Sequence, residues 1–298
     1  MAVSGARDRG LVVLADGVHA AFAAGAVAAL AEGGPSWVRV LGAGLGGQVA
    51  VLAALGEAED GVRRWRHEAK TGCPLLTPLA AAARVSAAPG MLILPDPWRM
   101  GGWLDPRALE EHLMPEAAAL PARLARTGVR CAVPRIDLVS GHVAWLTLNG
   151  LEAEPAAEAL LATATFAGGF PPREGRARVW GGVGGALMAG VHLDPVLSWD
   201  VVCGFPVPPT ERPAMGQSLF ELVQRRDEIA AGAMLADLAS GSGVRLLAPG
   251  EDGWRQVTGR PDAELGVEYP LPWERNGEVT ALLMDLGFLA GGGERSAV

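Results

Sequence analysis

The sequence predicts an α/β protein in which helices cover a largely parallel β-sheet. Its first third alternates short β-branched apolar runs with Ala-rich apolar stretches, and 50% of all residues are hydrophobic. A strand–helix–strand–helix order joins parallel strands through helical crossovers, which cover the sheet. The 298 residues suffice for one large α/β domain, and no repeat or long linker divides them. We therefore expect a single domain over residues 1–298.

The first third is expected to hold two strand–helix units. Apolar β-branched runs indicate strands, and Ala-rich apolar stretches indicate buried helices. The predicted elements are a strand at residues 11–14, a helix at 20–31, a strand at 37–41, a glycine-rich turn at 42–47 and a helix at 48–55. Asp16 and Gly17 form the turn that ends the first strand, and Gly33, Gly34 and Pro35 stop the first helix.

The rest of the chain is expected to add further strands and helices, with one hairpin. Asp105 followed by Pro106 marks a helix start. Ser140 and Gly141 turn the chain between two strand-like runs, which predicts the hairpin. The remaining predicted elements are helices at residues 57–70, 107–113, 155–165, 218–240 and 278–289, strands at 129–133, 135–139, 143–148, 196–204 and 244–248, and a second tight glycine-rich segment at 179–185.

The charge and hydropathy patterns exclude several partners. A formal net charge of −8 argues against a general nucleic-acid binder and against a protein that holds anionic membranes through basic charge. No stretch offers the roughly 18 uncharged apolar residues that a transmembrane helix needs. The first apolar run contains Asp16 and His19, which makes it a poor signal-peptide core. We expect a cytoplasmic protein without a transmembrane segment.

The three cysteines, Cys73, Cys131 and Cys203, are far apart and lie beside no histidine cluster. This spacing fits neither a disulfide framework nor a structural zinc site. We interpret them as small buried thiols in a reducing compartment. The sequence accordingly predicts no metal site and no cofactor.

The glycine-rich turn at residues 42–47, Gly-Ala-Gly-Leu-Gly-Gly, is compatible with three roles. It matches the dinucleotide pattern G-x-G-x-x-G through Gly42, Gly44 and Gly47. That fingerprint also requires a following strand that ends in an acidic residue about 20 positions on, whereas charged helical residues 57–70 come next. The turn also fits the nucleophile elbow G-x-S-x-G, with glycine in place of serine. Its third role would be close packing of a helix on a strand.

Several segments, in order, resemble the patatin-like phospholipases, especially the bacterial cytosolic-type members. The segments are LVVLADGVHAAFAAGAVAAL (residues 11–30), the elbow with its flanking residues (41–50), residues 102–113, RIDLVSGHVAWL (135–146), LATATFAGGFPP (161–172), VWGGVGGAL (179–187) and residues 224–249. Together they span nearly the whole chain. The resemblance implies a three-layer α/β/α sandwich with a central, mostly parallel sheet.

The resemblance also implies that both residues of the catalytic dyad are missing. In that family the elbow serine is the nucleophile, the aspartate of a DG[GA] motif is its base, and a first loop GGGxRG binds the oxyanion. The nucleophile position is Gly44 and the base position is Trp180. Of the oxyanion loop only Gly17 remains, and His19 replaces the arginine. Asp16 would bring a carboxylate to the place where negative charge should develop, which would oppose catalysis.

We therefore expect a pseudoenzyme, linked to lipid metabolism, that binds a lipid or acyl ligand or a partner protein. Its pocket and oxyanion-loop candidates are Asp16, Gly17, Val18, His19, Leu45, Gly181 and Gly182. One alternative is an enzyme with relocated chemistry, in which Asp16 and His19 act as a general acid/base pair. A second alternative is dinucleotide binding through the turn at residues 42–47.

Other polar and aromatic residues are given structural interpretations. Ser140 and His142 are expected in a turn, and His192 and Asp194 in a surface loop. Thr163 is expected to be a helix-side hydroxyl that bonds the backbone. Three tryptophans, Trp98, Trp103 and Trp180, are candidates to line an apolar pocket, although burial in the core is the expected role of most of the nine.

Overall fold

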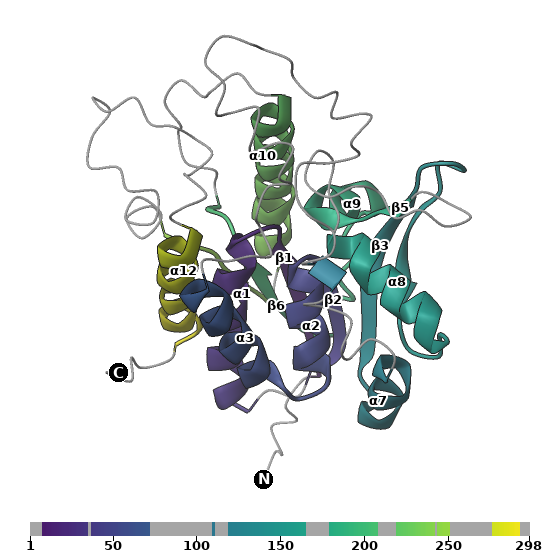
Figure 1. Cartoon of the computed structure of the whole chain (residues 1–298), viewed down its shortest axis with the longest axis horizontal. Coiled ribbons are helices and arrows are strands. Elements are labelled where there is room, and N and C mark those ends of the chain that lie inside the picture. Colours follow the sequence, from purple (N-terminus) through teal and green to yellow (C-terminus); the bar gives the residue numbers. More distant parts are fainter. Residues whose placement is uncertain are drawn as a thin grey trace.

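The computed structural model describes residues 8–34, 37–71, 109–110, 119–164, 179–207, 219–241, 243–250 and 276–292. These residues form one seven-stranded sheet whose main path has the order β4-β3-β2-β1-β6-β7, with β5 paired to β3 (Figure 1). The strands are β1 (Arg9–Ala15), β2 (Trp37–Gly44), β3 (Arg130–Asp137), β4 (Val143–Thr147), β5 (Val179–Trp180), β6 (Ser198–Cys203) and β7 (Val244–Leu247). Pairs β2–β1, β1–β6, β6–β7 and β2–β3 are parallel, whereas β4 and β5 run antiparallel to β3.

Helices cover both faces of the sheet, which gives three layers. The helices are α1 (His19–Glu32), α2 (Gly46–Ala54), α3 (Ala58–Lys70), α7 (Leu120–Thr127), α8 (Ala153–Ala164), α9 (Gly182–Ala189), α10 (Leu219–Ala239) and α12 (Asn276–Gly291). Alternate residues of β1 enter two separate cores. Leu11 and Val13 pack with residues of α1, α2, α8 and α12, whereas Val12 and Leu14 pack with residues of α9 and α10. This confirms the predicted α/β sandwich.

The structure corrects four details of the sequence prediction. Strand β2 continues to Gly44, so half of the expected glycine-rich turn is strand. The two runs predicted around Pro134 form the single strand β3. Proline is tolerated within it because Pro134 lies between the two pairings on that side of the strand: the pairing with β2 ends at Ala132, and the pairing with β5 begins at Ile136. The second glycine-rich segment is partly helical, because helix α9 begins at Gly182. Helix α7 was not predicted, and the helix expected at residues 107–113 lies mostly outside the described residues.

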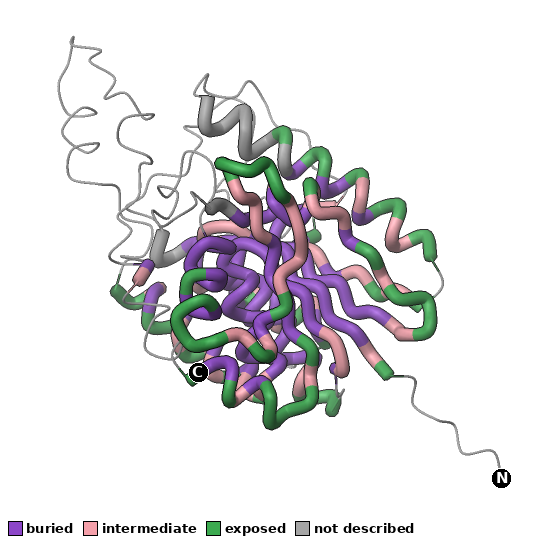
Figure 2. Tube along the Cα trace, turned by 90° about the vertical axis from the view of Figure 1, so that its right-hand side faces the viewer, coloured by how far each residue is buried: buried purple, intermediate pink, exposed green. Residues whose placement is uncertain are grey.

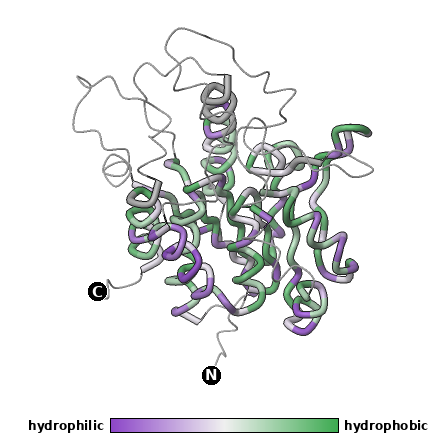
Figure 3. The backbone as a smooth tube through the Cα atoms, viewed as in Figure 1, coloured by the Kyte–Doolittle hydropathy of each residue, from purple (hydrophilic) through white to green (hydrophobic). Residues whose placement is uncertain are grey.

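Buried residues gather in the interior of the fold (Figure 2), and hydrophobic segments are found throughout the described chain (Figure 3). Helix α1 is buried along almost its whole length, in keeping with its Ala-rich sequence. It packs against α12 with main chain close to main chain, and glycines make this approach possible. A Cβ atom at Gly25 of α1 would overlap the carbonyl oxygen of Met284, and one at Gly287 of α12 would overlap that of Phe22. The two helices therefore form a seam in which small residues are required sterically.

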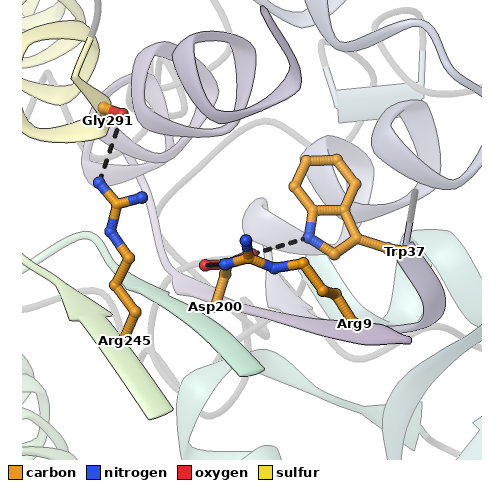
Figure 4. A network of polar contacts seen from close by, with 5 residues as sticks. All are labelled: Arg9, Trp37, Asp200, Arg245 and Gly291. Carbon is orange, nitrogen blue, oxygen red and sulfur yellow. Dashed lines mark hydrogen bonds and ion pairs between the residues drawn. The ribbon is translucent and has the colours of Figure 1, made fainter. Parts of the chain in front are cut away.

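A buried ion pair lies at the amino-terminal end of the central strands (Figure 4). Asp200 of β6 is fully buried, and one carboxylate oxygen accepts a hydrogen bond from the Arg9 guanidinium of β1 at 2.5 Å. The other oxygen accepts a hydrogen bond from the Trp37 indole of β2 at 3.0 Å. Three adjacent strands thus share one carboxylate, and each of its oxygens has a donor.

Removal of the cation from this pair should destabilise the protein strongly. We expect Arg9→Met to lower the free energy of unfolding by about 3–5 kcal/mol near neutral pH, because the Asp200 charge stays buried without its counterion. Urea unfolding followed by tryptophan fluorescence measures this. Arg63→Met is the control, since the pair of Arg63 with Asp60 is exposed and should contribute less than about 1 kcal/mol. Equal losses of unfolding free energy in Arg9→Met and Arg63→Met would contradict the stabilising role of the buried ion pair.

The helix seam gives a second stability prediction. Gly287→Ala should cost roughly 1–3 kcal/mol, because the added methyl group would push α12 away from α1. Gly61→Ala is the matched control: a Cβ at this helical glycine meets nothing closer than 3.6 Å, so higher helix propensity should stabilise the protein by up to about 1 kcal/mol. Thermal unfolding of both variants distinguishes the expected destabilisation by Gly287→Ala from the expected stabilisation by Gly61→Ala. An unchanged melting temperature of Gly287→Ala would refute the steric requirement for small residues between α1 and α12.

Candidate functional site

The candidate site begins where β2 ends and α2 starts. Gly44, the last residue of β2, has φ +67°, a left-handed conformation that residues with a Cβ rarely adopt. Leu45 follows, and α2 begins at Gly46. Gly44 is also paired with Ala15 at the end of β1. A sharp strand-to-helix turn with a left-handed central residue is the geometry of a nucleophile elbow, here without a side chain that can attack.

Asp16 fills the space beside this elbow. A Cβ atom at Gly44 would overlap Oδ1 of Asp16 and the carbonyl oxygen of Ala15. The Oδ1 atom exposes less than 1 Å² to solvent. The Oδ2 atom accepts a hydrogen bond from the main-chain N–H of Val183, at 3.0 Å. The carboxylate therefore lies between the end of β2 and the start of α9, and it contacts both.

Three helices begin around the turn that holds Asp16. The carbonyl oxygen of Asp16 accepts the N–H of His19, the first residue of α1, at 3.2 Å. Gly46, the first residue of α2, lies so close to β1 that a Cβ there would be 3.0 Å from the nitrogen of Ala15. Val183, which donates to Oδ2, is in the first turn of α9. Helix amino-termini carry partial positive charge, so a carboxylate is favourable at this position.

The second glycine segment reaches the same edge of the sheet. Trp180 belongs to β5, whose main chain pairs with Ile136 of β3. Gly181 comes directly after it, and a Cβ there would overlap Cα of Thr163. Gly182 has φ +71° and begins α9. The structure thus brings the elbow, the first loop and the start of α9 together, with Asp16 as the side chain that joins them.

His19 lies on the other flank of β1. Only 6% of this residue is exposed, and its Cβ and carbonyl oxygen lie against Gly204, where an added Cβ would be 2.8 and 2.7 Å from them. Gly204 comes just after β6, and β1 lies between β2 and β6. Asp16 therefore contacts the β2 side, whereas the start of the His19 side chain contacts the β6 side.

The glycines of the turn are explained by packing. A Cβ at Gly42 would overlap that of Ala50 in α2, and one at Gly47 would lie 2.7 Å from Cγ2 of Thr163 in α8. Helix α3 follows α2 directly. A dinucleotide-binding unit would have its next strand at this point, so the geometry favours a packing role for the turn.

The other candidate residues have structural surroundings. Ser140 and His142 are exposed at the hairpin tip, and His192 and Asp194 are exposed in a loop, as predicted. Thr163 is fully buried. The prediction that its hydroxyl bonds the backbone is wrong, because Oγ1 has no hydrogen-bond partner among the described residues. Thr165, Trp98 and Trp103 lie outside the described residues.

The two described cysteines are inert thiols. Burial raises the pKa of the Cys131 thiol to about 12, and burial also raises the pKa of the Cys203 thiol. Within the described ranges, no group of three or more His, Cys, Asp or Glu side chains is placed to hold a metal ion. In the same part of the chain, no helix combines the length and apolar character that crossing a membrane requires.

The three-layer sandwich, with an elbow and a loop meeting at one edge of the sheet, defines a three-layer α/β protein with a strand-to-helix elbow. The family model of the patatin-like phospholipases matches residues 17–196, more than half of the sequence, and the chain belongs to this family. None of the curated proteins matches it significantly. Among solved structures, VipD from Legionella pneumophila aligns with a TM-score of 0.43 and 12% identity, over 94% of this chain and 67% of that one.

Sequence reasoning did not anticipate the role of Val183. The resemblance placed Gly44, Trp180 and the loop around Asp16 in one site, and their main chains do meet at one edge of the sheet. The partner of Asp16 is an N–H group of the backbone, which every non-proline residue carries. The one available signal was the position of Val183 just after two glycines that open a helix.

Proposed function

We propose that this chain is a noncatalytic, cytoplasmic member of the patatin-like phospholipase family that binds a lipid or acyl ligand, or a partner protein, without hydrolysing it. The observation that carries the proposal is the elbow. Gly44 keeps the left-handed conformation of a nucleophile position but has no side chain. The space where that side chain would begin is taken by Asp16. Hydrolysis by the family mechanism requires a hydroxyl at this point.

Asp16 is poorly placed to take over the chemistry. A general base must lie within hydrogen-bond reach of the proton it removes. Oδ1 of Asp16 is buried against Gly44, and Oδ2 is engaged by the N–H of Val183. A substrate would have to displace one of these contacts before the carboxylate could act. This geometry favours the noncatalytic proposal over relocated chemistry with His19.

The family supports a lipid or acyl group as the first class of ligand to test. Patatin-like proteins act on lipids, and the sheet and helices that surround the site are present here. The net charge of −8 disfavours nucleic acid as a partner. Native mass spectrometry of the purified protein separates the two remaining possibilities: a co-purifying acyl species supports ligand binding, and a clean apoprotein favours a protein partner.

The wild-type protein should hydrolyse neither nitrophenyl esters nor lysophospholipids. We expect no turnover that a serine-directed phosphonate inhibits, because the elbow has no hydroxyl. Assays with and without the phosphonate, followed by intact-mass measurement, test this. Stoichiometric labelling of one serine would refute the noncatalytic proposal.

Restoring the dyad alone should not restore activity. We expect Gly44→Ser combined with Trp180→Asp to show no turnover above the wild-type background, since the new Cβ overlaps Asp16 and the Ala15 carbonyl group and the oxyanion loop remains altered. Ester hydrolysis measures the activity, and circular dichroism checks the fold. Trp180→Asp alone is the control. Family-like turnover by the double variant would show that the loop is not the obstacle.

A further inference from the structure

We infer that Asp16 is a steric latch: its carboxylate occupies the place between the elbow and the start of α9, and it keeps this place closed even to a restored nucleophile. The inference rests on the noncatalytic function proposed above and adds a cause to it. Loss of the dyad explains why the site has no nucleophile. The latch explains that the Asp16 carboxylate fills the space beside Gly44 and which contacts hold this carboxylate in place.

The steric part of the latch is the contact with Gly44. The carboxylate oxygen Oδ1 takes the position that a Cβ at residue 44 would need. Oδ1 is buried, so it fills this space and does not point into solvent. Any side chain at residue 44 must therefore displace Asp16. It must also meet the main chain of Ala15, which gives way less easily than a side chain.

The electrostatic part of the latch is the contact with α9. Oδ2 accepts the N–H of Val183 in the first turn of this helix. The starts of α1 and α2 adjoin the same turn of the chain. A negative charge is stabilised by the partial positive charge of helix starts, and the N–H of Val183 is the main-chain donor to Oδ2. The position thus suits an anion, and the protein supplies that anion from its own first loop.

The two contacts of Asp16 restrain different elements. Oδ1 holds the β1–α1 turn against the end of β2, and Oδ2 ties the same turn to α9. A carboxylate with one oxygen on each side fixes the distance between the elbow and the second glycine segment. Removal of the side chain should therefore free both contacts, whereas an isosteric neutral side chain should keep the space filled.

A double-mutant cycle tests the steric contact. Gly44→Ala should lower the urea midpoint of unfolding, and the loss should be smaller in an Asp16→Gly background, because the side chain that opposes the new methyl group is gone. In an Asp16→Asn background the loss should stay close to that in the wild type, since asparagine fills the same volume. Equal losses in the Asp16→Gly and wild-type backgrounds would overturn the latch.

Hydrogen exchange of the Val183 amide tests the electrostatic contact without any change at Gly44. A hydrogen bond to a charged acceptor is worth about 1.5–3 kcal/mol, so Asp16→Gly should speed exchange by at least about tenfold. Asp137→Asn is the control. Asp137 also accepts N–H groups, from Val139 and Ser140, but on the exposed hairpin turn, so this substitution should leave the exchange rate of the Val183 amide unchanged. Unchanged protection of Val183 in folded Asp16→Gly protein would overturn the proposal.

A labelling experiment connects the latch to reactivity. In the protein that carries Gly44→Ser and Trp180→Asp, we expect Asp16→Gly to raise the rate at which a fluorophosphonate labels the introduced serine. Equal labelling rates with and without Asp16 would overturn the latch. This outcome is distinct from labelling of the wild-type protein, which would refute the noncatalytic function itself.

Discussion

The close approach of Gly44 to the turn after β1 is the constraint on which the geometry of the site depends. The main chain of Gly44 is left-handed and stays paired with Ala15, so the end of β2 cannot move away from β1. Helix α2 begins two residues after Gly44, and Asp16 lies directly against Gly44. A Cβ at residue 44 would overlap both the Asp16 side chain and the main chain of β1, so packing requires glycine there. The same glycine has no side chain that could react.

Much of the fold could be predicted from local patterns. Strand β1 and helix α1 follow from an apolar β-branched run and an Ala-rich stretch separated by Asp16 and Gly17, and these signals lie within the segment itself. The end of β2 could not be predicted in the same way. Its last three residues, Gly-Ala-Gly, indicate a turn, but pairing with the end of β1 keeps them in the sheet. A tertiary contact here overrides the local preference.

The site, like the fold, combines features that the sequence indicates with features that depend on tertiary contacts. The resemblance placed Gly44 and the loop around Asp16 in one region, because the order of motifs carries that information. The contact from Asp16 to Val183 joins residues 167 positions apart through a main-chain N–H group. No residue type or spacing encodes such a bond. The sequence therefore indicated a carboxylate near the site, while its burial and its partner depended on how β1, β2 and α9 meet.

Two carboxylates at opposite ends of the central strands show how the protein uses buried charge. Asp200 has a guanidinium and an indole as donors, and its surroundings are formed by side chains of β1 and β2. The described contacts of Asp16 are instead with the main chain of a helix start and with a glycine. Arg9 supplies a full positive charge to Asp200, and the start of α9 supplies a main-chain N–H group to Asp16. The first arrangement joins neighbouring strands to each other, and the second joins the turn after β1 to the end of β2 and the start of α9.

That difference has a consequence for ligand binding. In open parallel sheets, ligands bind outside the carboxyl ends of the strands. Asp16 and Gly44 lie at this edge, and a carboxylate already occupies the position that suits an anion. A ligand that enters here must displace Asp16, or it must bind through apolar contacts beside it. Asp16 of the first loop therefore sets a condition for any ligand that the proposed function would bring to this edge of the sheet.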